Sequence, residues 1–210
     1  MSDGLFYVLL PRFNMFSLTN LMEPARIANY LSAEDLYQKT YLSFDGPNIM
    51  SSNGMMVECQ MAPKQMARDD LIFIVGSWGA EHYANRKLFS WLRVQARNGV
   101  RICAVEMGAY ILARAGLLAQ RSATMHWSYL AGFQEQFPDV DVQEQLFTED
   151  GPILCCSGAT AGLDLMLYII GGRHGQALAG EISDQIIHHP VRQAKDCLLY
   201  TSPSPRDVEE

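Results

Sequence analysis

The sequence contains no cluster of lysine and arginine, no long apolar run and no C-x-x-C pair. A formal charge of −7 with scattered basic residues argues against nucleic-acid binding by this chain itself, because phosphate contacts provide most of that affinity. No stretch approaches the roughly 18 consecutive apolar residues of a membrane span, and the first residues lack the basic start of a secretory signal. We therefore expect a cytoplasmic protein with no membrane segment, which reaches DNA only through another segment.

Cysteine is present, but without a pattern that indicates chemistry. The five cysteines stand at positions 59, 103, 155, 156 and 197, with no metal-ligand spacing. We expect them to be reduced and mostly packed in the core, and we predict neither a metal nor a cofactor. At 210 residues, 49% of them hydrophobic, the chain is long enough for one domain with one sizeable core.

Apolar runs of strand length alternate with helical patterns along the chain. The run LIFIV at residues 71–75 is apolar throughout, as expected of a strand covered on both faces. The alternation predicts an α/β fold, a three-layer sandwich with a mostly parallel sheet and helices on both faces. The expected strands span residues 5–10, 36–44, 71–75, 100–105, 142–147 and 153–156, with a hairpin at 49–59, and the expected helices span residues 18–31, 83–97, 110–115, 160–170 and 175–188.

Residues 100–118, VRICAVEMGAYILARAGLL, have the form of a nucleophile elbow. An apolar strand stops at Glu106, the small residues Gly108 and Ala109 follow, and a helix begins. Small neighbours are needed there because the residue at the tip has a strained backbone conformation. Enzymes built in this way have serine or cysteine at the tip, whereas this chain has a carboxylate.

Two other segments are expected beside this elbow, because ligands of a parallel sheet bind at the carboxyl ends of its strands. The loop GSWG at residues 76–79 follows an expected strand, and the amides of Gly76 and Gly79 are candidates for an oxyanion hole. His126 is a candidate base or hydrogen-bond donor. The alternatives are that the two glycines only form a turn and that His126 has a structural role.

The segments VGSWGAE, ICAVEMGAYILARAGLL, RSATMHW and SGATAGLDLMLYII, in this order, resemble the ThiJ/PfpI superfamily, also called class I glutamine amidotransferase-like. More narrowly, the sequence resembles the N-terminal ligand-sensing domain of GlxA-type transcriptional regulators of the AraC family. The resemblance covers residues 5–193 and implies a flavodoxin-like sheet, a small-molecule effector and a homodimer. The Met-rich stretch at residues 50–66 is a candidate dimer surface.

The tip of the elbow departs from the superfamily pattern. Catalytic members commonly have Cys-Thr-Gly there, with an activating histidine and an acidic residue, and the resemblance places His126 and Glu23 at those two positions. Cys103 does not replace the missing thiol, since a thiol buried in a strand has a raised pKa and reacts poorly. The alternative enzyme is a hydrolase or hydratase that uses Glu106, His126 and Glu23. Glu23 is equally interpreted as an ordinary acidic residue near the start of a helix, ahead of Pro24.

A carboxylate at the start of a helix suits a cationic ligand. The helix dipole favours negative charge there by about 0.3–1 kcal/mol, and an aromatic face attracts a quaternary ammonium group by about 0.5–2 kcal/mol. Regulators of the resembled kind that sense glycine betaine or carnitine often carry an acidic residue at this elbow. We predict a site for a small zwitterion whose carboxylate the loop amides receive, while Tyr110 has the alternative of a place in the core. The predicted ligand-binding residues are Gly76, Trp78, Gly79, Glu106, Tyr110, His126 and Trp127.

The domain is predicted to span residues 1–193, with a structural role for Asp164 near the start of a helix. Regulators of the resembled type continue into a linker and two helix-turn-helix motifs, but residues 194–210 here read AKDCLLYTSPSPRDVEE. We expect this stretch to be a disordered tail foreign to the family, with the DNA-binding domain missing. The predicted function is a non-catalytic, small-molecule-sensing domain of an AraC-family regulator. The alternatives are the enzyme described above and a dimerisation module without a ligand.

Overall fold

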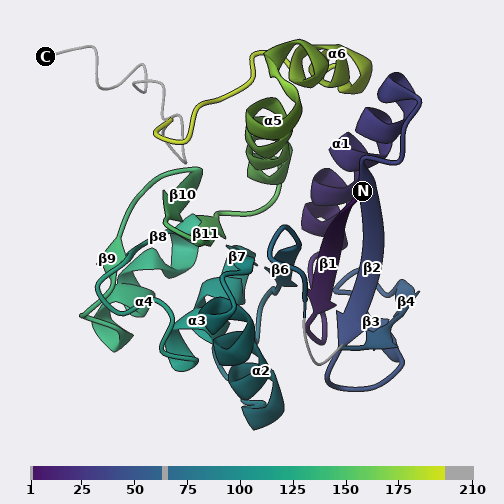
Figure 1. Ribbon diagram of the computed structural model, residues 1–210. Coiled ribbons are helices and arrows are strands. Elements are labelled where there is room, and N and C mark those ends of the chain that lie inside the picture. Colours follow the sequence, from purple (N-terminus) through teal and green to yellow (C-terminus); the bar gives the residue numbers. More distant parts are fainter. Residues whose placement is uncertain (1, 63–65, 197–210) are drawn as a thin grey trace, which may run out of the picture.

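The computed structural model describes residues 2–62 and 66–196, and its centre is a seven-stranded sheet (Figure 1). In the order in which they lie side by side, the strands are β10 (Phe147–Asp150), β11 (Ile153–Cys156), β7 (Arg101–Val105), β6 (Leu71–Val75), β1 (Asp3–Leu9), β2 (Tyr37–Ser43) and β5 (Gln60–Met61). All pairs are parallel except β10 with β11. The predicted α/β fold with a mostly parallel sheet is confirmed.

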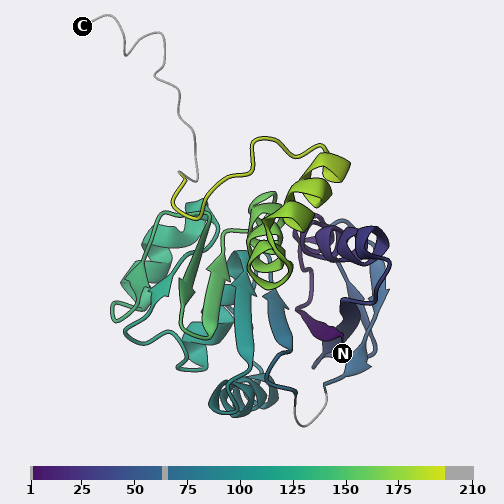
Figure 2. The ribbon, with the colours of Figure 1, turned by 45° about the horizontal axis from the view of Figure 1, so that its top comes forward.

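Helices cover both faces of this sheet, as Figure 2 shows from a second direction. The helices α1 (Met15–Ser32), α5 (Ala161–His174) and α6 (Gln176–Ile186) pack together on one face. The other face carries α2 (Arg86–Arg97), α3 (Ala109–Arg114) and α4 (Leu130–Gln136). This is the predicted three-layer sandwich.

The central strands are apolar throughout because they are buried on both faces. In β6, Leu71, Phe73 and Val75 belong to the core beneath α1 and α5, whereas Ile72 and Ile74 belong to the core beneath α2 and α3. Successive side chains of a strand point to opposite faces, so a strand between two layers needs apolar residues at every position. The two outer layers are therefore fixed to one rigid sheet.

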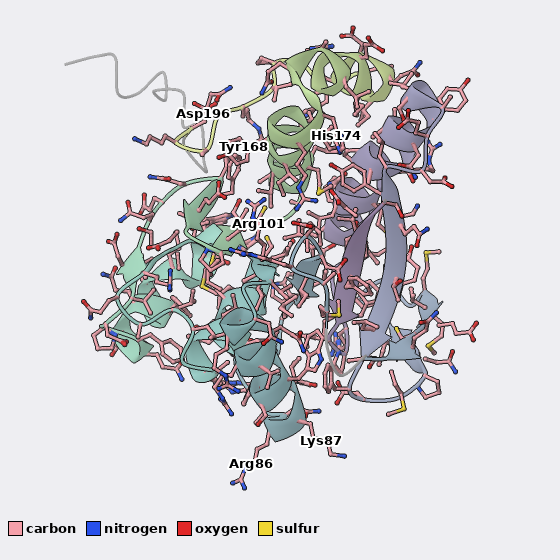
Figure 3. All side chains as sticks on the ribbon, in the orientation of Figure 1. Arg86, Lys87, Arg101, Tyr168, His174 and Asp196 are labelled. Atoms are coloured by element: carbon pink, nitrogen blue, oxygen red, sulfur yellow. The ribbon has the colours of Figure 1, made fainter. Side chains whose placement is uncertain are left out.

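The helices begin where side chains satisfy their first amides. Asn14 Oδ1 accepts hydrogen bonds from the amides of Phe16, at 2.9 Å, and Ser17, at 3.4 Å, and so caps α1. Asn85 caps α2 in the same way, and the exposed side chains of Arg86 and Lys87 project from the start of that helix (Figure 3). The cap at Asn14 also places a polar side chain in the segment between β1 and α1, at the edge of the sheet where a ligand is expected.

Most predicted elements are found, and the predicted hairpin is formed by β3 (Asn48–Met50) and β4 (Met56–Glu58). The strand predicted at residues 142–147 is wrong, because β9 (Asp141–Val142) pairs instead with β8 (Ser122–Ala123) in a separate small sheet. Residues 143–145 are all polar and have no apolar alternation to hold them over the core. The chain therefore joins the main sheet only at β10.

The end of the described chain bears on the predicted tail. Residues 197–210 lie outside the described residues, but Ala194 accepts a hydrogen bond of 3.0 Å from the amide of Leu146 and packs against the core. The ordered contacts thus extend at least one residue past the predicted domain boundary at 193. Within residues 2–62 and 66–196, no helix has the length and apolar character needed to cross a membrane.

Candidate functional site at the elbow

Four neighbouring strands end level with one another. Leu9 pairs with Val75, Val75 with Val105, and Val105 with Cys156. The residues that follow these strands therefore meet along one edge of the sheet, where ligands of doubly wound folds bind. The segments brought together are residues 10–14, 76–79, 106–108 and 157–160.

Glu106 occupies the tip of a sharp strand-to-helix turn. It follows β7 directly, lies in the short 3₁₀ turn η1 (Glu106–Gly108), and has a φ of +57°, which is unusual for a residue with a side chain. A Cβ on Gly108 would lie 2.3 Å from the carbonyl oxygen of Ile74, so only glycine lets the turn approach β6 this closely. The predicted elbow, with its need for small neighbours, is confirmed.

The carboxylate of Glu106 is held by three donors on one oxygen. Oε1 accepts hydrogen bonds from Ser17 Oγ at 2.5 Å, from Asn14 Nδ2 at 2.8 Å and from the amide of Ala159 at 3.2 Å. Hydrogen bonds to a charged acceptor are the strong ones, and the carboxylate of a residue of which only 4% is exposed needs them. The first turn of α1 and the loop after β11 thus fix Glu106 from two sides.

The loop after β11 fits closely around the carboxylate. Gly158 has a φ of +90°, and a Cβ there would lie 2.2 Å from Glu106 Cγ. The next residue, Ala159, donates its amide to Ser17 Oγ at 2.7 Å as well as to Glu106. The backbone of this loop is therefore in direct contact with the Glu106 side chain.

The second carboxylate oxygen, Oε2, faces a different environment. It accepts no hydrogen bond from the described residues, and it is not among their buried side-chain atoms that lack a partner. Oε2 therefore keeps at least a small accessible surface and has no protein donor, whereas Oε1 has three. Such a group offers a fixed, oriented acceptor for a cation or a hydrogen-bond donor.

A family model for the DJ-1/PfpI family matches residues 7–171 of this chain. The chain belongs to this family. The predicted membership of the ThiJ/PfpI superfamily is confirmed, and the elbow at Glu106 lies inside the matched region. The fold likeness extends to a solved AraC family transcriptional regulator from Pseudomonas putida, with a TM-score of 0.77, 25% identity, and coverage of 88% of this chain and 99% of that chain.

Curated relatives of this DJ-1/PfpI chain are named HTH-type transcriptional regulators. CdhR of Pseudomonas aeruginosa is 38% identical over 93% of this chain and 58% of that protein. GbdR of the same species is 36% identical over 90% of this chain and 52% of that protein, and GlxA of Rhizobium meliloti is 32% identical over 89% and 58%. The chain thus spans little more than half the length of the relatives it matches.

The loop amides of this DJ-1/PfpI domain are not open to a ligand carboxylate. Gly76 lies against the elbow, as expected, but its amide donates to the carbonyl oxygen of Val105 at 3.4 Å. Gly79 has a φ of +96° and donates its amide to Glu81 Oε2 at 2.9 Å. The prediction that these two amides receive a carboxylate is therefore wrong, because both serve the turn itself.

The three predicted aromatic residues separate into two groups. Tyr110 is buried, makes edge contacts with the rings of Phe133 and Phe137, and has the guanidinium of its own Arg114 at 5.8 Å from the ring centre. Its place in an aromatic cage is a wrong prediction, and the alternative place in the core is confirmed. In contrast, 66% of Trp78 and 51% of Trp127 are exposed, so both indoles are open to contact.

His126 and Glu23 do not form the partners expected of a catalytic pair with Glu106. His126 Nδ1 caps the short turn η2 (Trp127–Tyr129), with Ser128 Oγ at 2.8 Å. Glu23 pairs with Arg26 at 2.7 Å on an outward part of α1. It lies almost two turns beyond Ser17 on the same helix and is therefore directed away from the elbow. Within the described residues, no hydrogen bond joins either side chain to Glu106.

Sequence reasoning missed Asn14, Ser17 and Ala159, which are the groups that hold Glu106. A signal was available for Asn14, because asparagine before an apolar helical run is typical of an N-cap.

The expected burial of Cys103 is confirmed, and desolvation raises the pKa of its thiol well above the usual range. Across residues 2–62 and 66–196, no group of three potential ligands is arranged to hold a metal ion.

Proposed function

We propose that this chain is the effector-sensing domain of an AraC-type transcription regulator and has no catalytic role at its elbow. The observation that carries the proposal is Glu106, a carboxylate at the nucleophile position whose Oε1 is fixed by three donors while Oε2 accepts no hydrogen bond from the described residues. A carboxylate held in this way recognises a ligand without forming a covalent bond to it. The names of the curated relatives CdhR, GbdR and GlxA, each an HTH-type transcriptional regulator, support the regulatory role.

The ligand we propose is a small molecule with a methylated ammonium group. The carboxylate of Glu106 already accepts hydrogen bonds from protein donors, and its negative charge still attracts a cation. Quaternary ammonium groups also bind aromatic faces, and the exposed ring of Trp78 lies in the loop that follows β6, while the ring of Trp127 is exposed as well. Because the amides of Gly76 and Gly79 are occupied, recognition rests on the cationic end of the ligand.

Titration calorimetry with glycine betaine, dimethylglycine and carnitine tests this proposal on wild type and Glu106→Gln. The glutamine keeps an oxygen for Asn14, Ser17 and Ala159, so the substitution removes the charge and preserves the fold. We expect the affinity of the variant to fall by roughly tenfold to a hundredfold, the equivalent of about 1.5–3 kcal/mol for a charged interaction. The isostere 3,3-dimethylbutanoate, in which a neutral tert-butyl group replaces the trimethylammonium group of glycine betaine, should not bind.

Glu149→Gln is the matched control, since Glu149 pairs with Arg101, which begins β7, at the opposite end of that strand from Glu106. It should bind as wild type does. Equal binding to wild type and Glu106→Gln would remove charge recognition from the proposal. Turnover of amides, isocyanides or glyoxals that disappears in Glu106→Gln would replace the sensing role with an enzyme.

We further propose that the domain acts in the cytoplasm as a homodimer and that DNA is bound by a different part of the regulator. The hairpin of β3 and β4 exposes Met50, Met55 and Met56, and the edge strand β5 exposes Met61. Met50 and Met56 are partners in the register of the hairpin, and exposed methionines are typical of a contact surface. Light scattering should give a dimer for wild type and a monomer for the double variant Met56→Lys, Met61→Lys; a wild-type monomer would contradict this part.

A further inference from the structure

The loop of residues 157–160 touches both the elbow carboxylate and the last described segment of the chain. It connects β11 to α5 and is only four residues long. On one side, Gly158 packs against the Glu106 side chain and Ala159 donates to its carboxylate. On the other side, Thr160 Oγ1 accepts a hydrogen bond of 2.9 Å from Arg192 Nη2.

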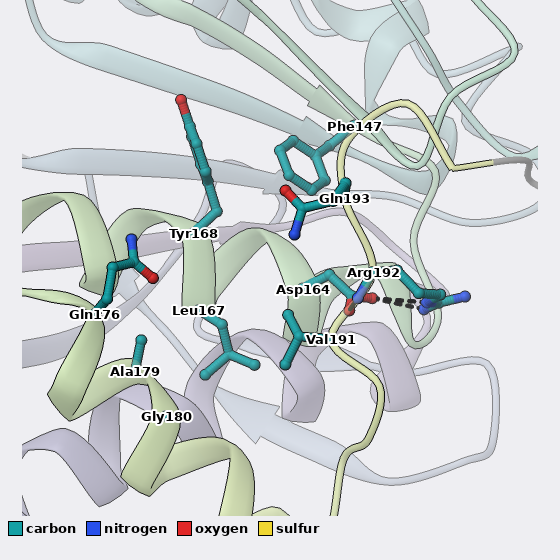
Figure 4. A pocket seen from close by; sticks show the side chains of 10 residues that line it. All are labelled: Phe147, Asp164, Leu167, Tyr168, Gln176, Ala179, Gly180, Val191, Arg192 and Gln193. Carbon is teal, nitrogen blue, oxygen red and sulfur yellow. Dashed lines mark hydrogen bonds and ion pairs between the residues drawn. The ribbon is translucent and has the colours of Figure 1, made fainter.

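Arg192 belongs to a segment that is fastened to α5 by a buried acid. Asp164 is fully buried and accepts hydrogen bonds from Arg192 Nη2 at 2.6 Å, from the Arg192 amide at 2.8 Å and from His188 Nε2 at 2.8 Å. Figure 4 shows Asp164 and Arg192 joined in this way beside Val191 and Gln193. We call residues 188–194 the clasped segment.

A second connection reaches the clasped segment from the other end of the loop. The amide of Ser157 donates to the carbonyl oxygen of Leu146 at 2.9 Å, and the amide of Leu146 donates to the carbonyl oxygen of Ala194 at 3.0 Å. Both ends of the loop are therefore hydrogen-bonded, directly or through one residue, to the clasped segment. The predicted structural role of Asp164 is to hold one of these two connections.

The close fit at Gly158 makes the loop sensitive to the elbow. The Glu106 side chain packs directly against the backbone of Gly158, where an added Cβ would lie 2.2 Å from Glu106 Cγ, so a rotation of the carboxylate changes its contacts with the loop. The amide of Ala159 is shared between Glu106 and Ser17, so a movement of either group changes its hydrogen bonding. A displaced loop then changes the contacts of Thr160 and Ser157 with the clasped segment.

We propose that the loop of residues 157–160 couples the state of Glu106 to the clasped segment, so that the contacts Thr160–Arg192 and Leu146–Ala194 report whether the elbow is occupied. In the proposed sensing function, this coupling transmits the state of Glu106 to the clasped segment, and its role in regulation rests on that function. The coupling itself is a property of the ligand-free chain. Because coupling between two sites is reciprocal, a change at either end must be measurable at the other.

Amide hydrogen exchange of the whole chain tests the coupling in both directions without a ligand. Glu106→Ala and, as a milder variant that keeps the carboxylate, Ser17→Ala remove hydrogen bonds at the elbow. We expect the amides of Arg192 and Leu146 to exchange faster by roughly 5-fold or more, the lower end of ordinary coupling between sites. In reverse, Arg192→Lys and Thr160→Val should accelerate exchange of the Ala159 amide by a similar factor.

Arg101→Lys is the matched control for Arg192→Lys, because it alters an arginine–carboxylate pair, with Glu149, that has no contact with the loop. Exchange at Ala159 should remain at the wild-type rate in this control. Unchanged exchange of Arg192 and Leu146 in Ser17→Ala would overturn the proposal. So would an acceleration at Arg192 and Leu146 that is no greater than the acceleration at amides of β1 and β2, because the loss of global stability expected for Ser17→Ala would then account for it.

Glycine betaine then serves as the probe for the link to function. If it binds in calorimetry, its addition to wild type should change exchange of the Arg192 amide, and binding without such a change would overturn the coupling. If it does not bind, the proposed ligand fails while the exchange measurements on Ser17→Ala and Arg192→Lys still decide the coupling. Failure of the proposed function and failure of the coupling are thereby distinguished.

Discussion

Ser17 donates a hydrogen bond of 2.5 Å to Glu106, a residue 89 positions away in the sequence. The bond joins the first turn of α1 to the tip of the elbow and helps to hold a negative charge where related enzymes have a nucleophile. Ser17 is fully buried and accepts in turn from the amide of Ala159. A single hydroxyl therefore connects three segments of the site.

Replacing Ser17 with alanine should destabilise the domain. A hydrogen bond to a charged group contributes about 1.5–3 kcal/mol, and its loss leaves Glu106 with two donors in a buried place. The free energy of unfolding, measured with urea, should fall by about this amount. Thr19→Ala is the control, because among the described residues the Thr19 hydroxyl donates to carbonyls of its own helix, and it should stay within about 0.5 kcal/mol of wild type. Equal losses in the two variants would show that the bond to Glu106 has no special weight.

Two glycines of the same region should respond in opposite directions to alanine. In Gly158→Ala the new Cβ would meet Glu106 Cγ, and the residue has a left-handed φ, so we expect a loss of at least about 1–3 kcal/mol of folding free energy. Gly172 lies in α5 with open space around it, and Gly172→Ala should stabilise the domain by about 0.5–1 kcal/mol. Urea unfolding of both variants decides the matter. A harmless Gly158→Ala would mean that the loop does not press on the carboxylate.

The sequence was sufficient to predict the elements whose signals are local. The strands β6 and β11 have the predicted bounds because each is a short apolar run followed by a turn, and the elbow follows from the order of strand, small residues and helix. The disordered tail over residues 194–210 was predicted from composition alone. Beyond Asp196 it lies outside the described residues and stays a prediction.

The sequence could not predict which residues form hydrogen bonds with Glu106, because these contacts depend on strand register. Ser17 and Ala159 meet Glu106 only because β1, β7 and β11 end level with one another, and residue periodicity does not fix which parallel strands are neighbours. Tyr110 was misplaced for a related reason, since helical spacing does not show which face of α3 points to the core. The amides of Gly76 and Gly79 were misjudged because their acceptors, Val105 and Glu81, are set by the shape of the turn.

The C-terminal end of α1 offers a stabilising substitution. Ala33 ends this helix with a φ of +55° and a ψ of +25°, the left-handed conformation in which glycine has no Cβ penalty. Ala33→Gly should raise the free energy of unfolding by about 0.5–1 kcal/mol. Ala177→Gly, an exposed position inside α6, should lower it by a similar amount of about 0.5–1 kcal/mol, and thermal unfolding of the pair gives the comparison. Destabilisation by both glycines would contradict the left-handed cap.

The buried thiols of β11 should make stability fall in alkaline solution. Desolvation by burial is the main cause that raises the pKa of Cys155 and of Cys156 to about 12, whereas a thiol in the unfolded chain has a pKa of about 8.5. Above that value the unfolded state loses protons that the folded state keeps, so the free energy of unfolding decreases as pH rises and recovers at lower pH. Each thiol contributes a slope of up to about 1.4 kcal/mol per pH unit. Urea unfolding between about pH 8 and pH 10 should therefore show a steeper decline for wild type than for the double variant Cys155→Ala, Cys156→Ala, and parallel declines would show that these thiols do not govern the alkaline limit.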